Sequence, residues 1–131
     1  MNDIKRIAVR GLDAKLPAME AFPTHFKDYT ITLRVPEYTS MCPKTGLPDF
    51  GNLTLTYVPN RHCVELKSFK YYIHAYRDVG IFYENAVNRI LEDFVKAVNP
   101  KWAVIRGDFT PRGGISTTVE ARHGKPPKGS V

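Results

Sequence analysis

The sequence has no long apolar run, no internal repeat and few cysteines. Its apolar runs are only a few residues long, whereas a membrane-spanning helix needs about 20 apolar residues. The first residues, MNDIKRIAVRGLDAKL, contain no apolar core of a secretory signal. Cys42 and Cys63 are the only two cysteines. We therefore expect a cytoplasmic protein without a membrane segment, whose two thiols are reduced.

Common nucleotide and metal motifs are also missing. The sequence has neither GxGxxG nor GxxxxGK[ST], so neither a Rossmann nor a P-loop nucleotide site is indicated. The histidines are not spaced as metal ligands, and the adjacent pair His62 and Cys63 lacks further ligands nearby. We expect no metal site.

What is present suits one domain over residues 1–131, with 43% hydrophobic residues to form a core. The net charge of +6 suits an anionic ligand such as a phosphate-bearing cofactor, a nucleotide or a nucleic acid. A solvated basic surface explains the same charge. Residues 1–27 are predicted to be an irregular arm, and residues 122–131 a mobile tail.

The order of hydrophobic patterns predicts an α+β fold. Apolar residues alternate in YTITLRVPE, LTLTYVP, WAVIRGDF and ISTTVEAR, which is typical of strands. Between the two pairs, apolar residues at helical spacing predict two helices, over residues 67–76 and 82–98. The order β-β-α-α-β-β predicts an antiparallel sheet with both helices on one face. Because such a sheet exposes its edges, we expect a homo-oligomer.

The segment TSMCPKTGLPDFGNL, residues 39–53, is predicted to be a loop that carries chemistry. Cys42 is a candidate nucleophile, although a cysteine is more often a small buried hydrophobe. Asp49 is close enough in sequence to share the site. As an anion it would disfavour a thiolate, so it suits a proton carrier better than an activating base. The alternative for Asp49 is a turn residue that caps its own backbone.

Other charged residues have two interpretations each. Lys67 and Lys70 lie one helical turn apart, and with Arg112 they are candidate phosphate contacts or parts of a solvated surface. Glu65 and Glu84 lie near the two helix starts, where they stabilise the helix dipole or bind paired N–H donors of a ligand. The aromatic residues of YYIHAY have core spacing, which argues against a stacking platform for RNA.

Four segments together resemble one family. CPKTGLPDFG, VELKSFKYY, GIFYE and FTPRGGI occur in the order and spacing of the NADPH-dependent 7-cyano-7-deazaguanine reductases, in their short single-domain form. The resemblance spans about Tyr38 to Gly124, and ELKSFKYY resembles the family's cofactor signature. It implies the tunnelling fold, which has the same β-β-α-α-β-β order. It also implies assembly into stacked rings, with active sites between subunits.

The resemblance further implies a reaction in queuosine biosynthesis. The nitrile of the deazapurine substrate is reduced to an aminomethyl group with two NADPH. Cys42 matches the nucleophile that forms a thioimide with the nitrile carbon. Asp49 matches the proton donor, which agrees with the charge argument above. After the first hydride transfer Cys42 leaves, and the second hydride reduces the imine.

Two further groups of residues match substrate positions of the family. Glu84 matches the carboxylate that binds the pyrimidine edge of the base, a role suited to a paired acceptor. Val64, Glu65 and Leu66 match a second segment in contact with the substrate. Tyr83 stands where many relatives have histidine, and it can donate one hydrogen bond but is not a cation near neutral pH.

The cofactor residues separate this interpretation from its alternatives. Lys67 and Lys70 belong to the signature for NADPH, and Arg112 is expected to join them. An amidinotransferase-like enzyme that acts on the same nitrile in transfer RNA would keep Cys42 and Asp49 but would not need this signature. A zinc hydrolase related to GTP cyclohydrolase would need the missing ligands. A basic RNA-binding module would bind RNA without Cys42; we expect no direct nucleic-acid partner.

Overall fold

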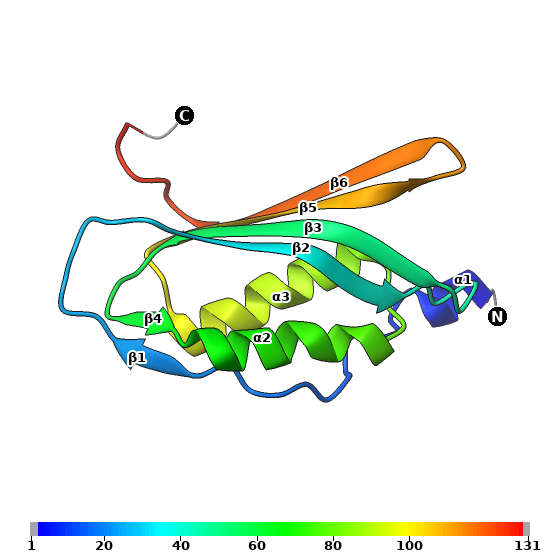
Figure 1. Cartoon of the computed structure of the whole chain (residues 1–131), viewed down its shortest axis with the longest axis horizontal. Coiled ribbons are helices and arrows are strands. Elements are labelled where there is room, and N and C mark those ends of the chain that lie inside the picture. Colours follow the sequence, from blue (N-terminus) through cyan, green and yellow to red (C-terminus); the bar gives the residue numbers. More distant parts are fainter. Residues whose placement is uncertain (1–2, 130–131) are drawn as a thin grey trace.

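A four-stranded antiparallel sheet covers a layer of helices in the computed structural model, which describes residues 3–129 (Figure 1). The sheet order is β2-β3-β5-β6, with β2 at Ile31–Met41, β3 at Pro48–Val58, β5 at Trp102–Arg112 and β6 at Ile115–Gly124. The helices α2 (Leu66–His74) and α3 (Tyr83–Val98) pack on one face, and the short 3-10 helix η1 (Ala75–Asp78) follows α2. The predicted arrangement of the sheet and its two long helices is confirmed.

The core lies between the sheet and these two helices. Alternate residues of β3, among them Leu53, Leu55 and Tyr57, are buried toward the helices. The intervening threonines are only partly buried, because successive side chains of a strand point to opposite faces. The opposite face of the sheet carries polar side chains, including an ion pair between Arg106 and Asp108 at 3.1 Å. The strand periodicity seen in the sequence therefore separates a core face from a polar face.

The helices follow the predicted apolar periodicity. In α2 and η1 the buried side chains include Phe69, Tyr72, Ile73 and Tyr76, which recur at helical spacing. Helix α3 ends at Val98 and is capped by Asn99, which adopts a left-handed conformation with φ of 50° and donates its N–H to the Val95 carbonyl at 2.9 Å. This is a common way to end a helix. Among the described residues, no helix is long and apolar enough to cross a membrane.

The N-terminal arm is more ordered than predicted. It contains a short helix α1 (Asp3–Ile7) and a strand β1 (Ala21–Pro23), which pairs antiparallel with β4 (His62–Val64). Between them, the Arg89 guanidinium of α3 donates hydrogen bonds of 2.5 Å to the carbonyls of Gly11 and Ala14. Asn85 donates another, of 2.6 Å, to the Ala8 carbonyl. Polar side chains of α3 thus fix the arm, which apolar periodicity could not indicate.

Two predicted boundaries are wrong. Residues 39–53 are not one loop, because β2 continues to Met41 and β3 begins at Pro48, so that only residues 42–47 connect the strands. The predicted tail starts too early, because residues 122–124 belong to β6 and pair with β5. Its last two residues, 130 and 131, lie outside the described part of the chain. Hairpin pairing on β5 extends β6 beyond its apolar residues.

Candidate active site

The Cys42 thiol stands in a short turn between two long strands. The Cys42 N–H donates to the Leu47 carbonyl at 2.8 Å, and the Gly46 N–H donates to the Cys42 carbonyl at 2.8 Å. Gly46 has a φ of +73°, which glycine adopts readily. The glycine and prolines of this segment therefore form a hydrogen-bonded turn that holds the cysteine at a fixed place, with its side chain partly exposed.

The residue before Cys42 connects the turn to the start of α3. The Met41 N–H donates to the Val79 carbonyl at 2.9 Å, and the Ile81 N–H donates to the Met41 carbonyl at 3.0 Å. This bridge places the end of β2 beside the connection that leads into α3 at Tyr83. The backbone thus brings two segments together that are about 40 residues apart in the sequence.

Asp49 is a strand residue rather than the predicted loop residue. It pairs with Ser40 in the β2–β3 ladder and is 4% exposed. The Tyr83 hydroxyl donates a hydrogen bond to Asp49 Oδ1 at 3.2 Å, and Arg112 Nη1 forms an ion pair with the same oxygen. An ionised carboxylate is costly to bury unless partners of this kind are paired with it. Asp49 therefore joins side chains from α3 and β5.

The turn favours ionisation of Cys42. Burial raises the pKa of the thiol, but hydrogen bonds from the Thr45 side chain and from the backbone of Thr45 and Lys44 lower it. The charge of Asp49 raises it, and the resulting pKa lies below the ordinary value of a cysteine. The predicted unfavourable effect of Asp49 on the thiolate is thus present, and the turn outweighs it.

Tyr83 and Arg112 complete this group of side chains. The Tyr83 ring stacks on Phe109, with ring centroids 3.9 Å apart and planes 11° from parallel. Burial, and then the charge of Asp49, raise the pKa of Tyr83. The phenol therefore stays protonated and can donate its hydrogen bond to Asp49. The charge of Asp49 raises the pKa of Arg112. Sequence reasoning placed Arg112 with the cofactor lysines; in this structure it forms an ion pair with the Asp49 carboxylate.

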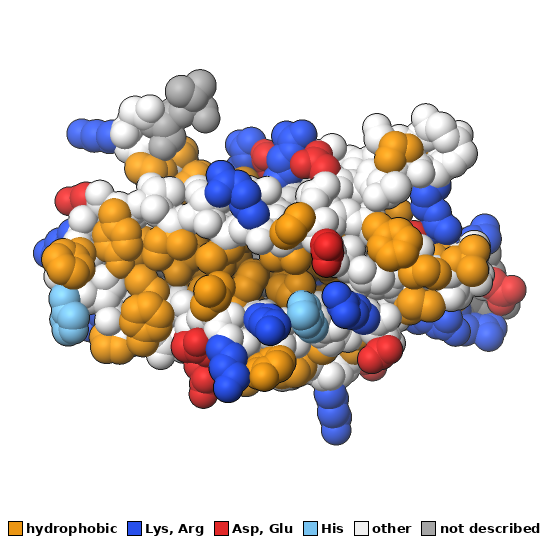
Figure 2. All heavy atoms as spheres, in the orientation of Figure 1, with side chains coloured by type: hydrophobic (Ala, Val, Ile, Leu, Met, Phe, Trp, Pro, Cys, Tyr) orange, Lys and Arg blue, Asp and Glu red, His pale blue; other side chains and the backbone are white. Residues whose placement is uncertain are grey.

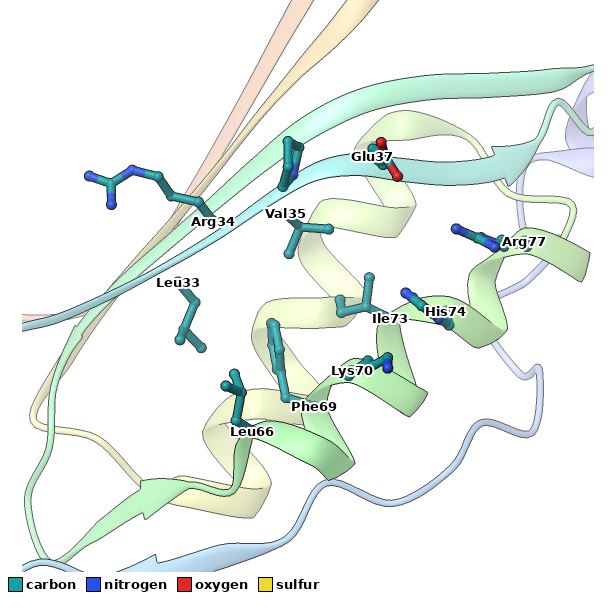
Figure 3. Close-up of a pocket in the computed structure, with 11 residues that line it drawn as sticks. Leu33, Arg34, Val35, Glu37, Leu66, Phe69, Lys70, Ile73, His74 and Arg77 are labelled. Atoms are coloured by element: carbon teal, nitrogen blue, oxygen red, sulfur yellow. The ribbon is translucent and has the colours of Figure 1, made fainter.

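The predicted cofactor lysines lie on the exposed side of α2. Lys67 Nζ is 5.9 Å from the centre of the Tyr71 ring, and Lys70 lines a groove of about 340 Å³ between α2 and β2. Figure 3 shows Arg34, His74 and Arg77 around the same groove, whose floor includes Phe69, Ile73, Leu33 and Val35. Figure 2 shows this strip of hydrophobic side chains with cationic ones beside it. Sequence reasoning placed His74 on the same helix face as Lys67 and Lys70 but did not single out Arg34 or Arg77, although Arg77 follows Lys70 at helical spacing.

The segment of Val64, Glu65 and Leu66 lies at the other end of α2 (Figure 1). Val64 is buried and Leu66 is 63% exposed. The Glu65 carboxylate caps α2, because its oxygens accept the N–H groups of Lys67 at 2.8 Å and Ser68 at 2.7 Å. The predicted stabilisation of the helix start is thus present for Glu65. Helices α2 and η1 separate this segment from the Met41 bridge by roughly 20 Å, from their rise per residue.

Glu84 follows Tyr83 in the first turn of α3, and its side chain is exposed. It lies at the helix end where a negative charge is favourable. Cys42, Asp49, Tyr83 and Arg112 therefore form one contiguous site with Glu84 at its side. The fold and this site define an α+β enzyme domain of the tunnelling-fold class, with a cysteine nucleophile candidate beside a buried carboxylate.

Comparison with known proteins agrees with this class. The family model described as QueF-like protein matches residues 48–128. The chain is 55% identical to the NADPH-dependent 7-cyano-7-deazaguanine reductase of Elusimicrobium minutum, over 95% of this chain and 99% of that protein. It is 56% identical to the reductase of the same name from Chloroherpeton thalassium, over 80% of this chain and 92% of that one. The chain belongs to the QueF-like family.

A solved structure supports the fold. The apo form of the archaeosine synthase QueF-Like superposes with a TM-score of 0.71 and covers 78% of this chain and 100% of its own. Its sequence is 24% identical. The tunnelling fold predicted from the sequence is thereby confirmed.

Proposed function

We propose that this chain is an NADPH-dependent reductase that converts the nitrile of 7-cyano-7-deazaguanine to an aminomethyl group, as a step of queuosine formation in transfer RNA. The observation that carries the proposal is the partly exposed Cys42 thiol beside the buried Asp49 carboxylate. The names of relatives more than 50% identical to the chain support the reaction.

A nitrile carbon is an electrophile that a thiol attacks. When Cys42 adds to it, a C–S bond forms and the thiol proton must reach the nitrile nitrogen, so that a neutral thioimide results. Asp49 is suited to carry this proton, because its carboxylate can take the proton from the thiol and return it to the nitrogen. The hydrogen bond from Tyr83 and the ion pair with Arg112 hold the carboxylate in place during the transfer.

Reduction then proceeds in two stages at the same carbon. NADPH, when bound, supplies one hydride at each stage. After the first stage the C–S bond breaks and Cys42 leaves as a thiolate, which its turn stabilises. Altogether one nitrile, two NADPH and two protons give one aminomethyl group and two NADP⁺.

The chemistry of α2 fits a phosphate-bearing dinucleotide. Lys67 and Lys70 are exposed cations one helical turn apart, and the groove beside Lys70 combines apolar residues with Arg34 and Arg77. Apolar side chains suit the flat face of a nucleobase, and the cations suit its phosphates. Lys67 and Lys70 would hold the phosphate that distinguishes NADPH from NADH, and Arg112 is a further candidate.

The substrate residues occur in two places, which supports a site between subunits. Tyr83 and Glu84 adjoin Cys42, whereas Val64, Glu65 and Leu66 lie at the opposite end of α2. One chain therefore cannot bring both groups to one deazapurine ring, but the end of a second copy can. The sheet edges at β2 and β6 are open for such pairing. We propose a homo-oligomer with closed rings, in the cytoplasm, where the two free thiols stay reduced.

The assignment is tested by incubating the purified protein with 7-cyano-7-deazaguanine and NADPH. We expect loss of NADPH absorbance and an aminomethyl product by mass spectrometry, with two NADPH consumed for each nitrile. An oligomer that binds the nitrile but oxidises no NADPH would overturn the proposal. Transfer of ammonia to the nitrile without NADPH would identify the amidinotransferase-like alternative.

A further inference from the structure

The N-terminal arm reaches the turn that carries Cys42. Arg10 Nη1 donates a hydrogen bond of 3.2 Å to the Pro43 carbonyl, which lies 33 positions later in the sequence. Arg10, Pro43 and Lys44 line a cavity of about 680 Å³ between the arm and this turn. A guanidinium of the arm therefore contacts the backbone of the residue next to the candidate nucleophile.

This hydrogen bond restricts the conformation of the turn. Two other hydrogen bonds within residues 42–47 are local, from the Cys42 N–H to the Leu47 carbonyl and from the Gly46 N–H to the Cys42 carbonyl. The ring of Pro43 sets its φ at about −65°, and the peptide group that follows is planar. A hydrogen bond to the Pro43 carbonyl therefore restricts its ψ, and with it the direction in which the chain leaves Cys42.

The arm is itself anchored on α3 just after Arg10. The Arg89 guanidinium donates to the carbonyls of Gly11 and Ala14, each at 2.5 Å. The same guanidinium forms an ion pair of 3.3 Å with Asp93, and the Arg89 side chain is only 14% exposed. Arg10 therefore extends from a fixed piece of backbone rather than from a free chain end.

The backbone after Arg10 also packs against the segment that leads into α3. Gly11 has a φ of +83°, and a Cβ at this position would lie 2.7 Å from both the Gly80 carbonyl oxygen and Ile81 Cβ. Ile81 in turn donates its N–H to the Met41 carbonyl at the end of β2. The arm, the end of β2 and the segment before α3 therefore meet at one place.

We propose that Arg10 is a positioning residue that holds the Pro43 carbonyl and so keeps Cys42 in the orientation from which it attacks. Arg89 anchors the arm for this purpose. The use of this arrangement in nitrile addition rests on the proposed function. The hold on the turn itself needs no ligand, because its contacts lie within one chain. Loss of Arg10 should thus slow the covalent step without removing a group that binds substrate or cofactor.

Hydrogen exchange of the purified full-length protein, followed by NMR, measures the hold on the turn. Arg10→Gln should fold, because Arg10 is exposed. It is expected to raise the exchange rates of the Cys42 and Gly46 amides by about tenfold, the effect of losing one hydrogen bond from a charged donor. Arg10→Lys keeps a charged donor, so a smaller increase is expected. Unchanged rates in Arg10→Gln would overturn the inference. This measurement uses neither nitrile nor NADPH, so it remains decisive if the proposed reaction fails.

The rate of thioimide formation without NADPH tests whether the hold matters for the chemistry. In Arg10→Gln the maximal rate is expected to fall by about 10-fold to 100-fold, because a small misplacement of a reacting group can cost this much. The nitrile concentration that gives half of the maximal rate should stay nearly unchanged, and Arg10→Lys should recover part of the rate. An unchanged maximal rate, or an effect on the half-saturating concentration alone, would contradict the positioning role.

Arg6→Gln is the matched control. Arg6 lies on α1 in the same arm and lines the same cavity, but its guanidinium pairs with Asp3 at 3.8 Å on the exposed surface. The substitution removes the same charge as Arg10→Gln and should leave both the exchange rates and the thioimide rate unchanged. Equal effects of the two substitutions would show that the charge of the cavity is responsible, and not the hydrogen bond to Pro43.

A double substitution tests the anchor. In an Arg89→Gln background the arm loses the hydrogen bonds to its carbonyls, so Arg10→Gln is expected to raise the exchange rates by less than it does beside Arg89. Equal increases in both backgrounds would contradict the anchoring role. If Arg89→Gln does not fold, Asn85→Ala provides the same comparison, because Asn85 donates to the Ala8 carbonyl at 2.6 Å from an exposed position.

Discussion

The hydroxyl of Tyr83 donates to Oδ1 of Asp49 at 3.2 Å, and it does so from a ring stacked on Phe109. The start of α3 and the middle of the sheet thus fix the orientation of one carboxylate. A histidine at position 83 would add a titratable donor. Tyrosine instead provides a donor that stays neutral throughout the physiological pH range, because its pKa is raised further.

Tyr83→Phe should keep the stacking and remove only this hydrogen bond. We expect kcat/KM for the nitrile to fall by about 10-fold to 100-fold, since a hydrogen bond to a charged group contributes about 1.5–3 kcal/mol. Steady-state kinetics at saturating NADPH measure the change, and the thermal unfolding midpoint checks that the fold persists. A variant with wild-type kcat/KM would show that Tyr83 does not orient Asp49 during the reaction.

Cys42→Ala should abolish the covalent adduct with 7-cyano-7-deazaguanine, because no other partly exposed thiol lies among residues 3–129. Intact-protein mass spectrometry after incubation without NADPH detects the adduct. Cys63→Ala is the control, since Cys63 is buried with its sulfur 3.2 Å from the Tyr29 hydroxyl. An adduct of ordinary yield on Cys42→Ala would place the nucleophile elsewhere.

Asp49→Asn should lower kcat by about 100-fold to 10,000-fold, the usual contribution of a positioned acid or base. The amide cannot take up the thiol proton and return it to the nitrile nitrogen. Stopped-flow measurement of thioimide formation locates the loss in the covalent step. If thioimide formed at the wild-type rate, another group would carry the proton.

Lys67→Ala and Lys70→Ala should raise the KM for NADPH by about tenfold and leave the KM for the nitrile nearly unchanged, because each removes one of the phosphate contacts that we propose for the cofactor. The same variants should lose much of their preference for NADPH over NADH. Lys101→Ala removes an exposed lysine just before β5 and serves as the control. Equal increases in both KM values would contradict a cofactor role.

Glu65→Gln should lower the unfolding temperature at neutral pH, and the difference from wild type should vanish in acid. Hydrogen bonds from the backbone of Lys67 and then Ser68 hold the pKa of Glu65 below its ordinary value. Since the folded pKa is the lower one, this stabilisation is complete above the unfolded pKa of about 4.3 and is lost as pH falls through the folded pKa. Differential scanning calorimetry over that range measures it; a difference independent of pH would show that the charge of Glu65 is not responsible.

The sequence predicted the elements of the sheet and the two helices because apolar periodicity reports which side faces the core. It misplaced Asp49 because Pro48 and Gly51 resemble turn residues. Proline is tolerated at the first position of a strand, and Gly51 is required because a Cβ there would lie 2.7 Å from the Phe109 ring. Because this segment is rich in turn residues, the sequence did not indicate that β3 begins at Pro48.

The sequence indicated which residues form the site better than it indicated the contacts between them. Cys42, Asp49 and Tyr83 were identified from motifs, but the pairing of Asp49 with Arg112 joins residues 63 positions apart. That contact depends on strand order and on an irregular register, which local sequence does not encode. The fixed N-terminal arm was missed for a similar reason, because side chains of α3 hold its backbone carbonyls.

Helices α2 and η1 separate Leu66 from the turn that carries Cys42, and this separation has a consequence for assembly. If each complete site joins the Cys42 end of one subunit to the Leu66 end of the next, contacts run head to tail. An open row of subunits then always leaves one thiol end and one Leu66 end unmatched. Only in a closed ring does the Cys42 end of every subunit meet the Leu66 end of another. Ring closure would therefore determine the number of complete active sites as well as the stability of the assembly.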